Sequence, residues 1–535
     1  MIESFRHTSP PFSHTTISAR SSVIRYQNIW SYQNNQFISE IRDDLENFID
    51  ITLTNHDGSF SLVLPNRGNM QFDTATGSTL RASMFIDGEF VTPHAHDSLE
   101  VENPATEEII ATTPDGTADD VARAVEAAKR AQPAWALRPA IERGRVVRKL
   151  SQLIADRSEE LARIIMAEQG KPIGQARGEV AATVGFLEYA AENARRIEGD
   201  IIVSDNPDEE IYIRRHPYGV VVGLTAWNYP AALAARKLGP ALVAGNGFVL
   251  LAHEITPLSG LFIASLAQQA GIPDGLFNVL TGRGPVVGQA LVEHPDTAMI
   301  TMTGSNRAGQ EIFRTAANGM KVLRLELGGK APFIVMEDAD IDRAVAAALT
   351  ARYTNCGQIC TCNERMYLHR AIADEFLDKF VSASAGLSIG DPMKDPDMGP
   401  KVSGPEIAKI KGIVDRSVAE GAEVLLEGGP LSEGTYARGH WYAPTVLQLK
   451  DNTSPVIRDE VFGPVVPAVR VNDFDEAMAM ANDSAYGLSA YIFTQNHRRL
   501  MQTPYRLKFG EIYVNRANGE QFQAFHNGWG QSGLG

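Results

Sequence analysis

The chain has 535 residues, and 49 Lys and Arg residues against 65 Asp and Glu residues give it a formal net charge of −16. This acidic balance argues against nucleic acid or an anionic membrane as the main partner. Hydrophobic residues make up 44% of the chain without any run of about 18 apolar residues, so we expect a core-forming protein without a membrane span, in roughly three to four domains or in two or three larger ones.

Residues 1–83 differ in composition from the rest of the chain. No acidic residue occurs between Ser4 and Ile38, whereas serine, threonine and arginine are frequent there, as in an organellar transit peptide. The alternatives are a disordered leader or a start codon placed too early, since Met84 would serve as an internal start. We predict a leader over 1–83 and a cytoplasmic protein, with mitochondrial targeting as the alternative.

Helices are predicted next, after a short hairpin. The apolar runs of 84–91 flank Asp87-Gly88, which is a strong signal for a two-residue turn. From Thr117, which resembles the start of a capping box, apolar residues recur with helical spacing as far as Gly170. We therefore expect a layer of helices before the first sheet. A second hairpin is predicted over 201–213, where two apolar strands flank a segment rich in turn residues.

From Tyr218 onward, short apolar strands alternate with helices. This rhythm predicts a parallel, doubly wound sheet whose ligands bind at the carboxyl ends of its strands. A second α/β series starts near Ala331 and runs to about Phe493. The predicted strands are 220–224, 248–251, 276–280, 299–302, 331–335 and 366–368, and the predicted helices are 231–243, one from 256, one from 286 and 340–351.

The only three cysteines, Cys356, Cys360 and Cys362, lie within one heptad. They cannot link distant segments, so a reducing compartment is expected. Cys360 lies in a loop between a predicted helix and a strand, where a thiolate of lowered pKa would be a strong nucleophile. A small buried hydrophobic residue is the alternative for it. Because the cysteines lack a partner pair or a nearby histidine, no metal site is predicted.

Two polar residues near strand ends would assist such a nucleophile. Glu326 ends an apolar strand before two glycines, and its carboxylate would reach a cleft as a general base. A surface ion pair is the alternative for this residue. Asn228 follows strand 220–224, and its amide would donate a hydrogen bond to an oxyanion, although asparagine in such a position is more often a helix cap.

Several motifs, in this order and spacing, resemble the aldehyde dehydrogenase superfamily, and within it the lactaldehyde and glycolaldehyde dehydrogenases. The resemblance implies an α/β fold with a Rossmann-like NAD-binding domain, a second α/β catalytic domain and a small oligomerisation hairpin. The motifs are Thr303-Gly-Ser305, Leu325–Lys330, Gly357–Cys360, Glu460–Pro464, Asn482–Gly487 and Asn515–Trp529. The expected segments are a leader at 1–83, the NAD-binding domain at 84–200 and 217–328, the hairpin at 201–216, the catalytic domain at 329–513 and a C-terminal pocket segment at 514–535.

The resemblance also implies roles for the catalytic residues. Cys360 would attack the aldehyde carbon and later carry the product as a thioester. The Asn228 amide and the backbone N–H of Cys360 would hold the oxyanion. Glu326 would activate the water that hydrolyses the thioester to a carboxylate.

At the substrate end, Arg236, Glu520 and His526 match positions of the aldehyde pocket in the lactaldehyde-type enzymes. Polar groups there would suit a short 2-hydroxyaldehyde such as lactaldehyde or glycolaldehyde. The alternatives are an ion pair on a helix surface for Arg236 and a loop histidine with satisfied hydrogen bonds for His526. A semialdehyde dehydrogenase, or an impaired relic with a binding or structural role, is the alternative function.

The implied cofactor is NAD. Glu254 follows strand 248–251, and its carboxylate would bind the adenosine ribose and repel a 2′-phosphate. Leu251 stands where the family carries a lysine, so we expect NAD affinity to be lowered by about 10- to 100-fold, with His253 as a partial substitute. The residues that the resemblance assigns to the cofactor are Thr225, Trp227, Glu254, Gly284, Gly304, Ser305, Gly309, Leu327, Glu460 and Phe462.

The chain stops at Gly535, whereas relatives of this family continue with a strand that pairs with a neighbouring subunit. Family members are dimers or tetramers, and the hairpin 201–216 resembles the other half of that contact. We therefore expect a homo-oligomer whose interface is weakened, with a small aldehyde as the other partner.

Overall fold

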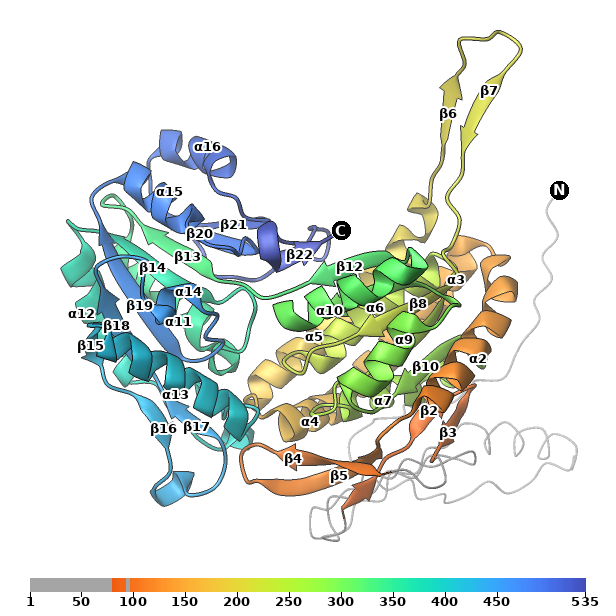
Figure 1. Ribbon diagram of the computed structural model, residues 1–535, viewed down its shortest axis with the longest axis horizontal. Coiled ribbons are helices and arrows are strands. Elements are labelled where there is room, and N and C mark those ends of the chain that lie inside the picture. Colours follow the sequence, from red (N-terminus) through yellow and green to blue (C-terminus); the bar gives the residue numbers. More distant parts are fainter. Residues whose placement is uncertain (1–78, 93–96) are drawn as a thin grey trace, which may run out of the picture. The chain divides into compact units, whose positions relative to one another are not determined.

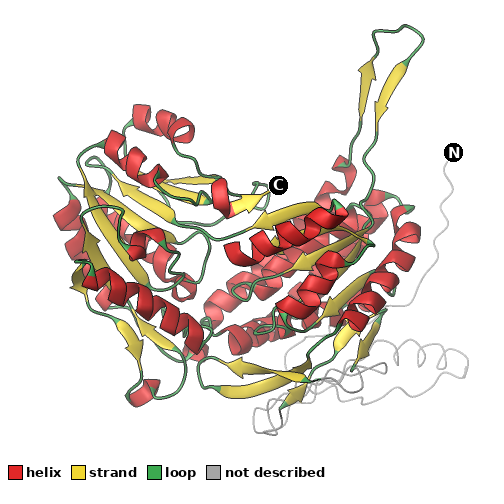
Figure 2. Cartoon of the chain, in the orientation of Figure 1, coloured by secondary structure: helices red, strands yellow, loops and turns green. Residues whose placement is uncertain are grey.

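The structure is a computed structural model that describes residues 79–92 and 97–535. Two large sheets flanked by helices dominate this part of the chain (Figure 1, Figure 2). The predicted leader lies outside the described residues as far as residue 78, while Leu80–Arg81 form strand β1. Among the described residues, no helix is both long and apolar enough to cross a membrane.

The first sheet has eight strands in the order β22-β12-β11-β8-β9-β10-β2-β3. The five strands from β12 to β10 in this order are parallel. Strands β8, β9 and β10 are buried along their whole length, which explains why their sequences are continuous apolar runs. The predicted strands are confirmed to within two residues. The bounds are β2 (Met84–Ile86), β3 (Glu89–Val91), β8 (Val220–Leu224), β9 (Gly247–Leu251), β10 (Phe277–Leu280), β11 (Thr297–Thr303), β12 (Val322–Glu326) and β22 (Gly533–Leu534).

The strand order reverses beside β8. Strands β9 and β10 follow on one side of β8, whereas β11 and β12 lie on the other side. In sheets of this kind the loops that leave the carboxyl ends on the two sides of such a point diverge and open a crevice. The loops after β8 and β11, which carry Asn228 and Gly304, therefore begin side by side.

Helices cover this sheet, and two of the predictions for them need correction. The predicted helical layer is present, and α4 ends at Gly170, whose φ of 90° is a left-handed cap. Strands β4 and β5 nevertheless precede the helices and pair with each other, and the segment from Val286 begins as a π-helical turn. The bounds are β4 (Ser98–Asn103), β5 (Glu108–Pro114), α2 (Ala118–Ala136), α3 (Ala140–Asp156), α4 (Ser158–Gln169), α5 (Ile173–Glu192), α6 (Pro230–Val243), α7 (Leu258–Ser265), α8 (Ala267–Ala270), α9 (Gln289–Glu293) and α10 (Asn306–Ala316).

The second sheet has seven strands in the order β15-β18-β19-β14-β13-β20-β21, all parallel except β15 at one edge. It contains the predicted strands at 331–335 and 366–368 and adds β21 after Phe493. The bounds are β13 (Ala331–Val335), β14 (Asn363–His369), β15 (Glu423–Leu426), β18 (Thr445–Leu449), β19 (Val465–Val471), β20 (Ser489–Phe493), β21 (Glu511–Val514), α11 (Ile341–Tyr353), α12 (Ala373–Ala385), α13 (Gly404–Ala419), α14 (Pro455–Arg458), α15 (Phe474–Asn482) and α16 (His497–Arg506).

The predicted hairpin is formed by β6 (Asp200–Val203) and β7 (Glu210–Ile213), which pair in an antiparallel register. Figure 1 shows the two strands extending away from the helices beside them. Every residue of both strands is exposed, including Ile201, Val203 and Tyr212. Apolar side chains are thus presented to the surroundings on a two-stranded ribbon.

Candidate active site

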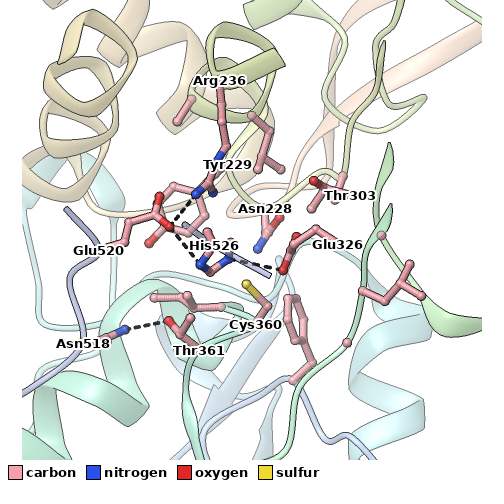
Figure 3. A pocket seen from close by; sticks show the side chains of 18 of the residues that line it. Asn228, Tyr229, Arg236, Thr303, Glu326, Cys360, Thr361, Asn518, Glu520 and His526 are labelled. Atoms are coloured by element: carbon pink, nitrogen blue, oxygen red, sulfur yellow. Dashed lines mark hydrogen bonds and ion pairs between the residues drawn. The ribbon is translucent and has the colours of Figure 1, made fainter. Parts of the chain in front are cut away.

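A cavity of about 510 Å³ lies where the first sheet's carboxyl edge meets the loop that precedes β14. The parts of the chain that line it include the loop after β8, the end of β12, the loop before β14 and the segment that follows β21, together with side chains of α5, α6, α11 and α13. The volume is in the range of sites for small molecules. Figure 3 shows the polar side chains that meet in this cavity.

The structure brings most of the predicted site residues to this one cavity. Cys360, Glu326 and Asn228 line it together with the three predicted substrate residues. Of the ten residues expected at the cofactor, six line the cavity and four lie outside its wall. The six are Trp227, Gly304, Ser305, Leu327, Glu460 and Phe462; the four are Thr225, Glu254, Gly284 and Gly309.

Cys360 is presented by an irregular loop between α11 and β14. The loop turns through left-handed backbone conformations at Asn355, Cys356 and Gly357, with φ values of 51°, 54° and 72°. Arg352 donates to the carbonyl of Gly357 at 3.1 Å and so holds the turn in place. Cys356 and Cys362 are buried, whereas the Cys360 side chain reaches the cavity.

The expected lowering of the Cys360 pKa is not found. Burial raises the pKa of the thiol to about 12, and the negative charge of Glu326 adds to the rise. The contact with His526 acts in the opposite direction but does not outweigh these effects. The raised pKa of Cys360 could not be predicted from the sequence around it, because the residues that raise the pKa come from distant segments.

Asn228 is held rigidly although it follows a strand as a loop residue. Its backbone carbonyl accepts hydrogen bonds from Lys171 Nζ at 2.8 Å and from Asn355 Nδ2 at 3.2 Å. Its own Nδ2 donates to the carbonyl of Gln358 at 2.9 Å. An amide group carries two N–H donors, so the second one is left for a group in the cavity. The alternative interpretation of Asn228 as a helix cap is not supported, since α6 begins after Tyr229.

Glu326 is the last residue of β12, and its side chain is 13% exposed. Burial acts to raise the pKa of its carboxyl group, but the contact with His526 and the charges of Arg236 and Lys237 lower the pKa on balance. Its Oε1 atom lies 3.4 Å from His526 Nε2, an ion pair whose geometry falls outside that of a hydrogen bond. An ionised carboxylate paired with this imidazole therefore faces the cavity near Cys360.

His526 lies at the centre of three carboxylates. Its Nε2 is 3.4 Å from Glu326 Oε1 and its Nδ1 is 3.1 Å from Glu520 Oε2, as Figure 3 shows. Nδ1 also lies 2.5 Å from Glu511 Oε1. Burial would lower the pKa of the imidazole, but its contacts with Cys360, Glu326 and Glu511 raise the pKa well above its usual value of 6.5. The raised pKa favours the cationic form of this side chain. Its contacts agree with the alternative of a loop histidine with satisfied hydrogen bonds, but the side chain also lines the cavity.

Glu511 was not among the residues singled out in the sequence. It is the first residue of β21, and contact with His526 lowers its pKa although burial acts to raise it. A lone carboxylate ahead of an apolar strand was the only available signal. Arg236, in α6, donates to Glu520 Oε2 at 2.7 Å, and this ion pair lies in the cavity wall rather than on the helix surface.

Gly328 lies in the part of the cavity beside β11 and β12, where its lack of a side chain lets the Glu460 carboxylate come close: an added Cβ atom would lie 2.8 Å from Glu460 Oε2. Trp227 and Phe462 form an edge-to-face pair with ring centroids 5.5 Å apart. The N-terminus of α10 is capped by Ser305, whose hydroxyl accepts the N–H of Ala308 at 3.3 Å. A carboxylate cradle at Gly328, flat rings and a helix N-terminus suit a dinucleotide with a planar ring and a pyrophosphate.

The residues expected around the adenosine half of the cofactor differ in their burial and in the polar atoms they offer. Glu254 is half-buried just beyond β9, and Leu251 is buried in the core with no polar atom to offer. Burial lowers the pKa of His253 to about 4, so this imidazole is neutral, and its Nδ1 accepts the N–H of Ile255. Gly284 is exposed, and a Cβ added there would meet nothing within 4 Å, so close packing does not require this glycine.

A buried ion cluster supports both sides of the site. Glu364, 2% exposed at the start of β14, accepts hydrogen bonds from Lys330 Nζ at 2.6 Å and Arg352 Nη1 at 3.0 Å. It also accepts the backbone N–H groups of Val461 and Phe462 at 3.0 Å. One carboxylate therefore ties the loop that carries Phe462 to the strand that follows Cys360.

Replacing Glu364 with glutamine should destabilise the fold strongly. Loss of one partner leaves two buried cations unpaired, which typically costs about 3–5 kcal/mol. These cations and the two N–H groups hold the pKa of Glu364 at about 2, below its usual 4.5. A depressed pKa stabilises the protein at neutral pH, and this contribution is lost as the pH falls below about 4.5 toward 2. Denaturant unfolding should show an earlier midpoint for Glu364→Gln at pH 7, and a smaller difference at low pH.

The control for this variant is Glu375→Gln. Glu375 pairs with Lys379 at 2.9 Å, but its side chain is 57% exposed, and surface pairs contribute little. An unfolding midpoint for Glu364→Gln equal to that of the control would contradict the importance given to the buried cluster.

This chain is similar to known proteins in both sequence and structure. The model of the Aldehyde dehydrogenase family matches residues 90–535. A 3,6-anhydro-alpha-L-galactose dehydrogenase of Vibrio sp. (strain EJY3) is 46% identical over 457 residues, which cover 85% of this chain and 95% of that protein. The lactaldehyde dehydrogenase of Escherichia coli (strain K12) is 44% identical over 454 residues, covering 84% and 94%. A solved 3,6-anhydro-L-galactose dehydrogenase in complex with NAP is 48% identical, with a TM-score of 0.83 and coverage of 85% and 96%.

Proposed function

This chain belongs to the aldehyde dehydrogenase family, and we propose that it oxidises a small 2-hydroxyaldehyde to the carboxylate with NAD as the cofactor. The observation that carries the proposal is the convergence of Cys360, Glu326 and Asn228 on one cavity with Arg236, Glu520 and His526. Members of the family use a nicotinamide cofactor, and the cradle beside Gly328 and Glu460 fits one.

In the proposed reaction, Cys360 Sγ forms a bond to the aldehyde carbon. The thiol must first lose its proton, which passes to solvent. The positive charge of His526 beside it favours the thiolate, whereas burial and Glu326 oppose it. The oxygen of the adduct becomes negatively charged, and the free N–H of the Asn228 amide and the backbone N–H of Cys360 are the donors that would hold it. The fixed position of Asn228 means that these donors need no rearrangement during the step.

A nicotinamide cofactor held beside Gly328, Glu460 and Phe462 would supply the hydride acceptor. Cys360 would then carry the acid as a thioester. Glu326 then acts on the water that attacks this thioester. Its carboxylate, kept ionised by a lowered pKa, suits it to take the proton of that water. The C–S bond breaks, the carboxylate is released and the thiol is restored.

The polar end of the cavity supports the choice of a hydroxyaldehyde. Lactaldehyde carries a hydroxyl group beside its aldehyde, and Glu520 and His526 supply an acceptor and a charged donor for such a group. A site built to bind a hydroxyl group rejects analogues that lack it, because its buried polar groups are left unpaired. Arg236 is neutralised by Glu520 at 2.7 Å, so it does not favour the distal carboxylate of a semialdehyde.

The test of this substrate class compares lactaldehyde with propanal, which differs mainly by the hydroxyl group. We expect kcat/KM for lactaldehyde to be at least about 10-fold higher, and the preference to shrink in Glu520→Gln, since a hydrogen bond to a charged group contributes about 1.5–3 kcal/mol. Glu406→Gln, which alters another carboxylate of the same cavity, serves as the matched control. Equal turnover of both aldehydes, or better turnover of succinate semialdehyde, would overturn the proposed substrate.

The choice of NAD rests on Glu254, whose carboxylate would repel a 2′-phosphate. We expect KM for NADP to exceed KM for NAD by about 10- to 100-fold, and Glu254→Ala to remove this difference. Steady-state titration of both cofactors at saturating aldehyde measures it, with the exposed Glu293 replaced by alanine as the control. A wild-type enzyme that prefers NADP would contradict the assignment of Glu254, as would a Glu254→Ala variant with unchanged preference.

The exposed hairpin supports a proposal about assembly. Apolar residues on both β6 and β7 face the surroundings, and an uncovered ribbon of this kind is prone to pair with another chain. We propose that a second copy of this chain covers it in a dimer or tetramer.

A further inference from the structure

Three atoms of different chemical type meet where Cys360 faces His526. The Cys360 sulfur, a ring nitrogen of His526 and a carboxylate oxygen of Glu326 all lie within 4.8 Å of one another. Figure 3 shows the sulfur directed toward the other two side chains. They come from three separate elements: the loop before β14, the C-terminal segment and the end of β12.

The distances among these atoms suit a small divalent metal ion. Two ligands about 2.1 Å from a tetrahedral zinc ion lie about 3.4 Å apart. This matches the 3.4 Å between His526 Nε2 and Glu326 Oε1. A thiolate, an imidazole and a carboxylate form a ligand set typical of zinc, whereas magnesium and calcium prefer oxygen ligands.

The surroundings of the three atoms resemble the support that metal ligands receive. A histidine that binds a metal through one nitrogen usually donates its other N–H to a carboxylate. Nδ1 of His526 lies 2.5 Å from Glu511 Oε1. Glu326 Oε1 is paired with His526 Nε2 at 3.4 Å, a contact that a metal ion between the two atoms would replace. The Oδ1 atom of Asn228, which is 5% exposed and lines the same cavity, has no hydrogen-bond partner among the described residues.

Charge balance is also favourable. A thiolate and the Glu326 carboxylate together offset a 2+ ion, while the neutral imidazole adds no charge. Of the two nearby cations, Arg236 is offset by Glu520 at 2.7 Å, whereas Lys237 donates to the neutral hydroxyl of Thr303 at 2.8 Å and keeps its charge. Three protein ligands would leave the fourth position open toward the cavity.

We propose that Cys360, His526 and Glu326 bind Zn²⁺ reversibly and that the bound ion blocks the active site. On binding, the Cys360 S–H and the His526 Nε2–H bonds break, both protons pass to solvent, and bonds from sulfur, nitrogen and the Glu326 oxygen to the metal form. No change of oxidation state is involved. The blocking effect rests on the proposed function, because it requires Cys360 to be the nucleophile; the binding itself does not.

Titration of the full-length protein with zinc chloride tests the binding by calorimetry, and Co²⁺ is used in parallel as a spectroscopic probe. We expect one zinc ion per chain and a sulfur-to-cobalt absorption band that is absent from Cys360→Ala. His526→Gln should weaken zinc binding by at least about 10-fold. Two matched controls should bind as the wild type does: Cys356→Ala, which alters a buried cysteine outside the cavity, and His369→Gln, which alters a histidine of β14.

Equal zinc affinity of the wild type, Cys360→Ala and His526→Gln would overturn the site, as would a cobalt complex without the sulfur band. Thermal unfolding of each variant confirms that it is folded. Zinc should also slow the reaction of Cys360 with a thiol reagent, with recovery on addition of EDTA, and this readout does not depend on turnover. If the enzyme oxidises aldehydes but binds no zinc, this inference is refuted and the proposed function stands. If the protein binds zinc but oxidises no aldehyde in metal-free buffer, the proposed function is refuted and the zinc site stands.

Discussion

Replacing Cys360 with alanine is expected to lower kcat for aldehyde oxidation by about 10⁴-fold or more, because removal of a nucleophile abolishes the covalent route entirely. The structure gives the reason for expecting so large an effect. Cys360 is the cysteine whose side chain reaches the cavity, and the described residues place no second thiol in its wall. The formation of reduced nicotinamide from lactaldehyde and excess cofactor measures the change.

The matched control is Cys356→Ala, four residues earlier in the same loop. The Cys356 side chain is buried outside the cavity, so this variant should keep the wild-type rate to within a few fold. Comparable losses in both variants would indicate damage to the loop rather than loss of a nucleophile. A wild-type protein that is folded and silent with every aldehyde would mean that the retained residues are relics of an ancestral activity.

Replacing Glu326 with glutamine is expected to separate the two halves of the reaction. The negative charge of Glu326 raises the pKa of Cys360, so its removal does not hinder formation of the thiolate. Hydrolysis of the thioester loses its base, which typically costs about 10²- to 10⁴-fold. Stopped-flow measurements should therefore show a rapid burst of about one reduced cofactor per site, followed by a slow steady state.

Glu406→Gln is the control for this variant. Glu406 lines the same cavity and pairs with Lys409 at 2.8 Å, but it has no part in the proposed steps. It should retain wild-type turnover. A Glu326→Gln variant in which the burst and the steady state fall together would assign Glu326 to the first half of the reaction instead.

The sheets were predictable because their physical signals are local. A strand buried on both faces, such as β8, must be apolar along its length, and the helices around it must repeat their apolar residues every three or four positions. The prediction of the family is confirmed, and it rested on short motifs such as those around Glu326, which ends β12, and Cys360, which lies in the loop before β14.

Features that depend on distant segments escaped prediction. Strands β4 and β5 lie ahead of the helices, and the alternation of buried and exposed residues in β4 was the available signal for them. The carboxylate of Glu511 belongs to the site only because it contacts His526, which a loop places beside it. The raised pKa of Cys360 likewise depends on burial by the whole cavity wall, so no local pattern foretold it.

The most direct test of the central claim is intact-mass spectrometry of Glu326→Gln after mixing with lactaldehyde and excess NAD. The account predicts a single adduct whose mass is that of the aldehyde less two hydrogen atoms, located on Cys360 by peptide mapping and absent from the Glu326→Gln, Cys360→Ala double variant. An unmodified protein, or the same adduct on another residue, from an enzyme shown to oxidise the aldehyde before the substitution, would contradict the thioester on Cys360.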